Sequence, residues 1–144
     1  MIACNMIDAA EAEAVIAAAA AKAAAMGVPQ NIAVVDAAGH LVAFRRMDGA
    51  KFMSIEIAMA KAFTAAGARK ETVDVMPATL PGQPGYGIQN LHGGRVTTLG
   101  GGIPLVREGA VVGALGVSSG SVAEDMAVAE AGARSFNSAG NAAE

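Results

Sequence analysis

PGQPGYGIQNLHGGRVTTLGGGIPLVREGAVVGALGVSSGS, residues 81–121, carries the strongest structural signal in this chain. Glycine and proline surround two short apolar segments that have the composition of β-strands. Repeated glycine sacrifices side-chain packing and chain entropy, so its density here requires tight turns or the close approach of another group to the backbone. We therefore expect a flat ligand or a neighbouring subunit to lie against this bare main chain.

The second half of this stretch predicts a β-hairpin. Residues 103–107 and 110–117 have strand composition, and Glu108 and Gly109 between them are typical of a two-residue turn. Pro104 cannot donate a ladder hydrogen bond, so it should lie at a sheet edge, a strand start or a bulge. The hairpin is therefore expected to occupy one side of a sheet.

The rest of the chain predicts helices around two hairpin-type units. Helical spacing of apolar residues, capping residues and turn residues mark the limits of each element. The expected elements are helix 8–26, strands 31–36 and 40–47, helices 54–66 and 70–75, strands 95–99, 103–107 and 110–117, and helix 121–136. The tail after Phe136 should be frayed. This order, αββααβββα, has no βαβ rhythm and predicts an α+β protein with a five-stranded, mostly antiparallel sheet flanked by helices.

Length and composition predict one soluble domain over residues 1–144. The chain is 53% hydrophobic and 16% charged, with a mean hydropathy of +0.43. Charged residues interrupt each apolar run and no export signal is present, so we expect a cytoplasmic protein without a membrane partner. A small domain with so few charges should bury surface against copies of itself, which predicts a homo-oligomer.

The charges and ligating side chains argue against two classes of function. The net charge is −3 and aromatic residues make up 3% of the chain, so we expect no nucleic-acid partner. One cysteine and two histidines do not supply the usual ligand set of a structural zinc site, so no metal site is predicted.

Three side chains have the chemistry of an axial ligand to the metal of a bound cofactor. His40 and His92 are the only imidazoles, and Met47 offers a thioether beside the second expected strand. The alternative for each histidine is an ordinary position at a turn, and the alternative for Met47 is to fill the core. The sequence does not decide between these interpretations.

Three further residues are candidates for contact with a small molecule. Tyr86 lies in a glycine-flanked loop, where it either covers a ring-shaped ligand or anchors the loop. Lys61 either pairs with a carboxylate or propionate or is a solvated residue at the edge of a helical stripe. Gly101, in a run of three glycines, permits another backbone or a flat ligand to come close.

Five segments, in order, resemble the GlcG/HbpS family of haem-degrading or haem-binding proteins, which includes the C-terminal domain of PduO-type corrinoid adenosyltransferases. They are VVDAAGHLVAFRRMDGA (34–50), KAFTA (61–65), PGQPGYGIQ (81–89), GGGIPL (100–105) and GALGVSSGSVAED (113–125). The resemblance implies a profilin-like fold, an assembly that is often octameric, and haem or a corrinoid as the ligand.

Three functions follow as hypotheses. The leading one is a binding module for haem or a corrinoid, which assists haem degradation. The second is an enzyme that acts on a small organic intermediate of a catabolic operon, with Tyr86, Lys61 and the glycine-rich backbone as hydrogen-bond donors. The third is a non-catalytic accessory protein whose role lies in its oligomeric interface.

Overall fold

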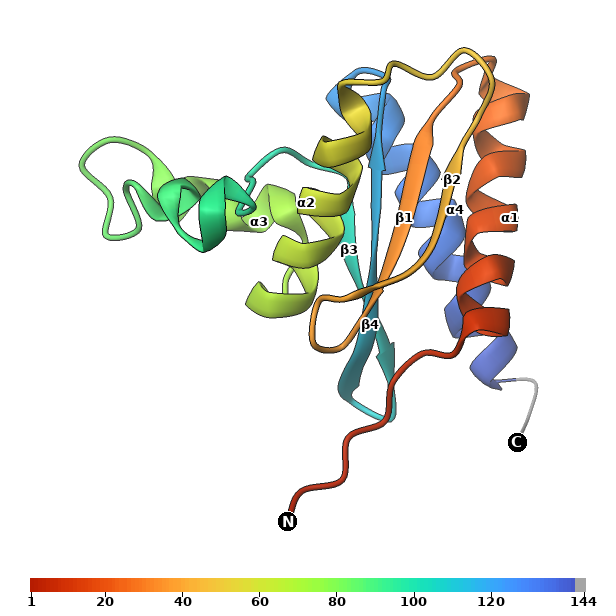
Figure 1. The fold of residues 1–144 in the computed structure, drawn as a ribbon, viewed down its shortest axis with the longest axis horizontal. Coiled ribbons are helices and arrows are strands. Elements are labelled where there is room, and N and C mark those ends of the chain that lie inside the picture. The colour runs from red at the N-terminus through yellow and green to blue at the C-terminus, as the bar shows by residue number, and fades with distance from the viewer. Residues whose placement is uncertain (142–144) are drawn as a thin grey trace.

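The structure, a computed structural model that describes residues 1–141, is an α+β fold in three layers (Figure 1). Its sheet is antiparallel throughout, with the strand order β2-β1-β4-β3. Helices α1 and α4 cover one face of the sheet, and helix α2 covers the other. The main elements are α1 (Ala9–Met26), β1 (Asn31–Asp36), β2 (Leu41–Arg46), α2 (Ser54–Ala68), α3 (Thr72–Val75), β3 (Gly102–Arg107), β4 (Ala110–Ser118) and α4 (Val122–Asn141).

Local signals place the first helix and the second hairpin as predicted. The Asp8 side chain accepts a hydrogen bond from the Glu11 N–H, and the Glu11 side chain accepts one from the Asp8 N–H, so a capping box opens α1. Gly27 ends this helix in the left-handed conformation. In the β3–β4 turn, Glu108 and Gly109 have φ values of 51° and 75°, as a tight hairpin turn requires.

Alternation along β1 divides the core between the two faces of the sheet. Ile32 and Val34 are fully buried under α1 and α4, whereas Ala33 and Val35 pack on the α2 side. The buried residues of the α2 side are mostly alanines. Small side chains there allow helix α2 to approach the sheet backbone closely.

Glycine is required where α2 crosses strands β3 and β4. A Cβ atom at Gly116 would collide with the carbonyl oxygen of Ala58, and one at Gly102 would lie 2.5 Å from the carbonyl oxygen of Lys61. Both neighbours belong to helix α2 of the same chain. The expectation that the glycine-rich stretch faces a ligand or another subunit is therefore wrong at these positions, where the glycines serve helix–sheet packing.

The sheet has four strands, not the predicted five, because residues 95–99 form no strand. The Thr64 hydroxyl, on α2, accepts a hydrogen bond from the Thr97 N–H at 3.0 Å, and the Thr72 hydroxyl, on α3, donates to the Leu99 carbonyl at 2.6 Å. These hydroxyls satisfy backbone groups that a neighbouring strand would otherwise satisfy. The order of the main elements is therefore αββααββα; the profilin-like description stays a prediction.

Helix ends also differ from the predictions. Helix α2 continues through Gly67 to Ala68, and its C-cap residue, Arg69, has a φ of 54°. Helix α3 begins two residues later than expected, at Thr72, and α4 continues beyond Phe136 to Asn141. Of the tail predicted to be frayed, residues 137–141 are helical and residues 142–144 lie outside the described part of the chain.

Residues 72–94, which begin with α3, form an arm that leaves the three-layer body before β3 (green in Figure 1). After α3, the arm contains three short 3-10 helices, Met76–Thr79, Ile88–Asn90 and His92–Gly94. The Gly85 N–H donates to the Ala78 carbonyl at 2.8 Å, which closes part of the arm on itself. Within residues 1–141, no helix combines the length and the apolar character needed to cross a membrane.

Candidate functional site

A pocket of about 540 Å³ lies where the arm meets the body of the protein. The turn between β1 and β2, the C-terminal part of α2, the arm and the two residues after it form its walls. We call it the arm pocket and define it by six of its lining residues, Gly39, Phe63, Gly67, Leu91, His92 and Arg95. Apart from Thr64, His92 and Arg95, the lining consists of apolar side chains and glycines.

Phe63 connects the groups of the arm pocket. The His92 ring meets it edge-on, with the ring centroids 5.4 Å apart and the planes at 66°. The guanidinium carbon of Arg95 lies 4.1 Å from the Phe63 ring centroid. The β1–β2 turn also reaches this ring, since a Cβ atom at Gly39 would be 2.8 Å from Phe63 Cδ2. One aromatic side chain therefore contacts both an imidazole and a guanidinium.

The arm pocket carries one permanent charge, the guanidinium of Arg95. Among residues 1–141, no carboxylate lies within ion-pair distance of this group. His92 has a φ of 51° and exposes its imidazole to solvent. In a chain of net charge −3, an apolar pocket with an unpaired cation favours an anionic ligand.

His40 lies next to the arm pocket, one residue after Gly39. Its side chain is 81% exposed, and its Nδ1 atom is 3.7 Å from the Asp36 carboxylate. The His40 backbone N–H donates to the same carboxylate oxygen at 3.0 Å. Both histidines of the chain thus belong to segments that border one pocket, but only His92 lines it.

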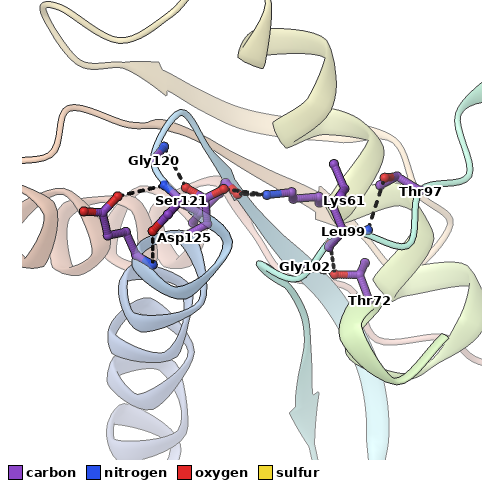
Figure 2. Close-up of polar contacts among 10 residues, drawn as sticks. Lys61, Thr72, Thr97, Leu99, Gly102, Gly120, Ser121 and Asp125 are labelled. Carbon is purple, nitrogen blue, oxygen red and sulfur yellow. Dashed lines mark hydrogen bonds and ion pairs between the residues drawn. The ribbon is translucent and has the colours of Figure 1, made fainter. Parts of the chain in front are cut away.

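Lys61 does not line the arm pocket; it is buried in a polar cluster that joins three elements (Figure 2). Its Nζ atom donates to the carbonyl oxygen of Val117 on β4 and to Oδ2 of Asp125 on α4, both at 2.8 Å. The other carboxylate oxygen of Asp125 accepts from the Gly120 N–H at 2.9 Å. Burial lowers the pKa of Lys61, and the hydrogen bond and charge of Asp125 oppose this effect.

Gly101 belongs to this buried cluster. Its φ is 115°, and a Cβ atom there would lie 2.8 Å from the Val117 carbonyl oxygen and 3.1 Å from Lys61 Nζ. Glycine is therefore needed at this position, directly before β3, for close packing against the Val117 carbonyl and the Lys61 ammonium group. No ligand is required to explain it.

The structure does not bring Tyr86 or Met47 to the arm pocket. Tyr86 lies on the arm with 69% of its surface exposed, and Met47 is half-buried against the core beneath α1 and α4. The enzyme hypothesis required Tyr86 and Lys61 in one site, but the first is exposed and the second is enclosed by its own partners. Within this chain, the two residues named by that hypothesis therefore do not form one site.

A larger hollow, of about 820 Å³, lies between α1, the β3–β4 turn and the end of α4. Its cation, Arg107, is paired with Glu11 and lies 4.5 Å from the centroid of the Phe136 ring. Glu11 also serves the capping box of α1. Because its one cation already has a partner, this hollow is a weaker candidate for an anionic ligand than the arm pocket.

Sequence patterns do not identify Phe63 and Arg95 as functional candidates. Phe63 lies on the apolar stripe of α2, where an aromatic residue is typical of a core, and Arg95 lies in the segment taken for a strand. They meet only because the arm folds back onto α2, which no local pattern reveals. A resemblance segment, residues 61–65, does include Phe63.

The fold and the arm pocket together define a small three-layer α+β protein with a candidate ligand-binding site. The chain belongs to the family described as "Haem degrading protein HbpS-like", whose model matches residues 7–134. This match confirms the resemblance drawn from the five sequence segments.

Similar proteins with known structures share nearly the whole fold. Klebsiella pneumoniae protein ORFY is 33% identical, with a TM-score of 0.93 over 95% of this chain and 94% of that one. A structure described as a PduOC:heme complex is also 33% identical, with a TM-score of 0.86 over 90% and 94% of the two chains. Corrinoid adenosyltransferase PduO of Citrobacter freundii is 40% identical over 120 residues, which are 83% of this chain but 36% of PduO. The chain thus spans about a third of that relative.

Proposed function

We propose that this protein binds haem, or a related flat tetrapyrrole such as a corrinoid, in the arm pocket. Membership of a family described as haem-degrading and the similarity to a PduOC:heme complex support a tetrapyrrole ligand; the corrinoid alternative is suggested by the name of PduO. The observation that carries the proposal is the contact of His92 and Arg95 with the same Phe63 ring.

The residues of the arm pocket fit the chemistry of haem. Apolar walls suit the macrocycle, the exposed imidazole of His92 suits the iron, and the guanidinium of Arg95 suits a propionate. Bound haem iron would supply the redox chemistry on which haem degradation depends. The chain itself would hold the ring on Phe63, orient it through Arg95 and keep bulk water from its buried face.

Gly67 provides a direct test of the location. It lines the arm pocket from within helix α2, and a Cβ atom there would meet nothing within 4 Å. Gly67→Trp should fill the pocket without disturbing the helix, while Gly67→Ala should leave the pocket open. In titrations followed by the Soret band, we expect wild type and Gly67→Ala to bind one hemin per chain and Gly67→Trp to bind none. Equal binding by both variants would place the ligand elsewhere, and no saturable binding by wild type would refute the function.

The role of His92 as an iron ligand can be tested separately from hemin affinity. His92→Ala should change the position and shape of the Soret band, because the iron would lose an imidazole ligand, whereas His40→Ala should leave the wild-type spectrum. A wild-type spectrum for His92→Ala would exclude it as a ligand. The same series with hydroxocobalamin in place of hemin tests the corrinoid alternative.

We also propose that the protein acts as a homo-oligomer, as its composition and the resemblance imply. Large exposed apolar side chains on the loop before α2 and on the arm support this proposal, including Phe52, Met53, Tyr86 and Leu91.

A further inference from the structure

We propose that Arg95 makes the arm pocket selective for flat ligands that carry a carboxylate, whether or not they contain a metal. This inference rests on the proposed function, because it concerns the ligand of the same pocket. It goes further by naming the chemical group that is recognised and the residue that recognises it.

The carbonyl oxygen and the Nε atom of Arg95 have protein partners, while its two Nη atoms are available. The Thr64 hydroxyl donates to the Arg95 carbonyl oxygen at 3.4 Å, and Arg95 Nε donates to the His92 carbonyl oxygen at 3.3 Å. Over residues 1–141, neither Nη atom of Arg95 donates to a protein acceptor. The guanidinium thus presents its outer edge to solvent at the pocket, where two parallel N–H groups match a carboxylate.

Arg95 is also the one cation that a ligand in this pocket meets. The chain has ten lysines and arginines, and Arg95 alone is part of the pocket lining. Two other cations, Lys61 and Arg107, are engaged by Asp125 and Glu11. A carboxylate on the ligand would therefore gain its ion pair from Arg95 and would not displace an existing one.

His92 and Arg95 are expected to recognise different parts of the ligand. His92 offers an imidazole, which matters only to a ligand that contains a metal. Arg95 offers a charge-assisted pair of hydrogen bonds, which matters equally to a metalloporphyrin and to the free base. Loss of Arg95 should therefore weaken hemin and metal-free protoporphyrin IX alike, whereas loss of His92 should weaken hemin more.

The experiment uses the fluorescence of metal-free protoporphyrin IX and of its dimethyl ester, titrated in one detergent-containing buffer. The variants are Arg95→Gln and, as a charge-matched control, Lys22→Gln on the exposed side of α1. We expect Arg95→Gln to bind the diacid about tenfold more weakly than wild type, as the loss of a hydrogen-bonded ion pair implies. Lys22→Gln should bind like wild type, and Arg95→Lys should fall between the two.

The ester distinguishes recognition from structural damage. Wild type should prefer the diacid to the ester, and Arg95→Gln should bind both equally, with a smaller dependence on salt. Similar diacid affinities for Arg95→Gln and Lys22→Gln would overturn the inference while leaving hemin binding intact. Equal loss of diacid and ester affinity would also overturn it, because the residue would then only support the pocket. If wild type binds neither hemin nor the free porphyrin, the proposed function itself fails.

Discussion

The ammonium group of Lys61 is enclosed by acceptors from two other elements, and it connects α2, β4 and α4. The Asp125 carboxylate depends on this ammonium group in turn, because the side chain of Asp125 is only 4% exposed. Two charges removed from water are tolerated when they meet each other and further hydrogen-bond partners, but either one alone is costly. The pair therefore determines how these three elements fit together more than it adds to total stability.

We predict that Lys61→Met is strongly destabilised, because it leaves the Asp125 carboxylate buried with one oxygen unpaired. The expected loss is about 3–5 kcal/mol of unfolding free energy. The double variant Lys61→Met, Asp125→Asn removes the charge but keeps an acceptor for the Gly120 N–H, so it should recover most of this loss. Urea unfolding of wild type, the single variant and the double variant measures both effects. A double variant no more stable than Lys61→Met would contradict this account.

Among the elements, the segment that leads from the arm into β3 depends on threonine hydroxyls in place of a strand partner. The hydroxyl of Thr72 donates to the Leu99 carbonyl and accepts from the Gly102 N–H at 3.0 Å. Thr72 and Gly102 are both buried, so water does not readily replace the contact between them. One side chain of α3 therefore fixes the start of β3 and, through it, the base of the arm.

Thr72→Val should cost about 1–3 kcal/mol of unfolding free energy, because it keeps the shape of the side chain but leaves the buried Gly102 N–H and the part-buried Leu99 carbonyl without their partner. Thr72→Ser is the matched control, since it keeps the hydroxyl and loses a methyl group. We expect the serine variant to be the more stable of the two in thermal and urea unfolding. The reverse order would show that packing of the methyl group, and not hydrogen bonding, holds this segment.

Sequence patterns correctly predicted those elements that depend on interactions between residues close together in the chain. The capping box at Asp8 and Glu11 and the turn at Glu108 and Gly109 act over at most three residues, and both appear in the structure. Residues 95–99 have strand composition, but the hydroxyls that bind them come from two helices distant in sequence. A pattern within the segment could not indicate that partner, so the fifth strand was predicted wrongly.

The candidate site, too, could be predicted only in part from local sequence patterns. Lys61 looked like the edge of a helical stripe because its partner, Asp125, lies 64 residues later. His92 was singled out from its chemistry alone, and the structure places it at a pocket. Phe63 and Arg95 gave no such signal, because their contact depends on the arm folding back onto α2.

At the scale of the whole molecule, several large apolar side chains remain exposed. Phe52 and Met53, beside the N-terminus of α2, are 77% and 68% exposed, and the arm exposes Tyr86 and Leu91. Contiguous exposed apolar surface is typical of interfaces, and Phe52 and Met53 are neighbours in the sequence. Because only 16% of the residues are charged, few long charged side chains are available to lie over this apolar surface.

We predict that the purified protein is an oligomer in solution and that Phe52→Ser lowers its mass. Replacing an aromatic side chain at the centre of an interface removes apolar burial that the free subunit does not need, so the subunit should stay folded. Size-exclusion chromatography with light scattering measures the mass, and far-UV circular dichroism checks the fold. Val106→Ser, a change at an exposed position on β3, is the control and should keep the wild-type mass. A monomeric wild type would contradict the prediction, and an unchanged mass for Phe52→Ser would exclude this loop as the interface.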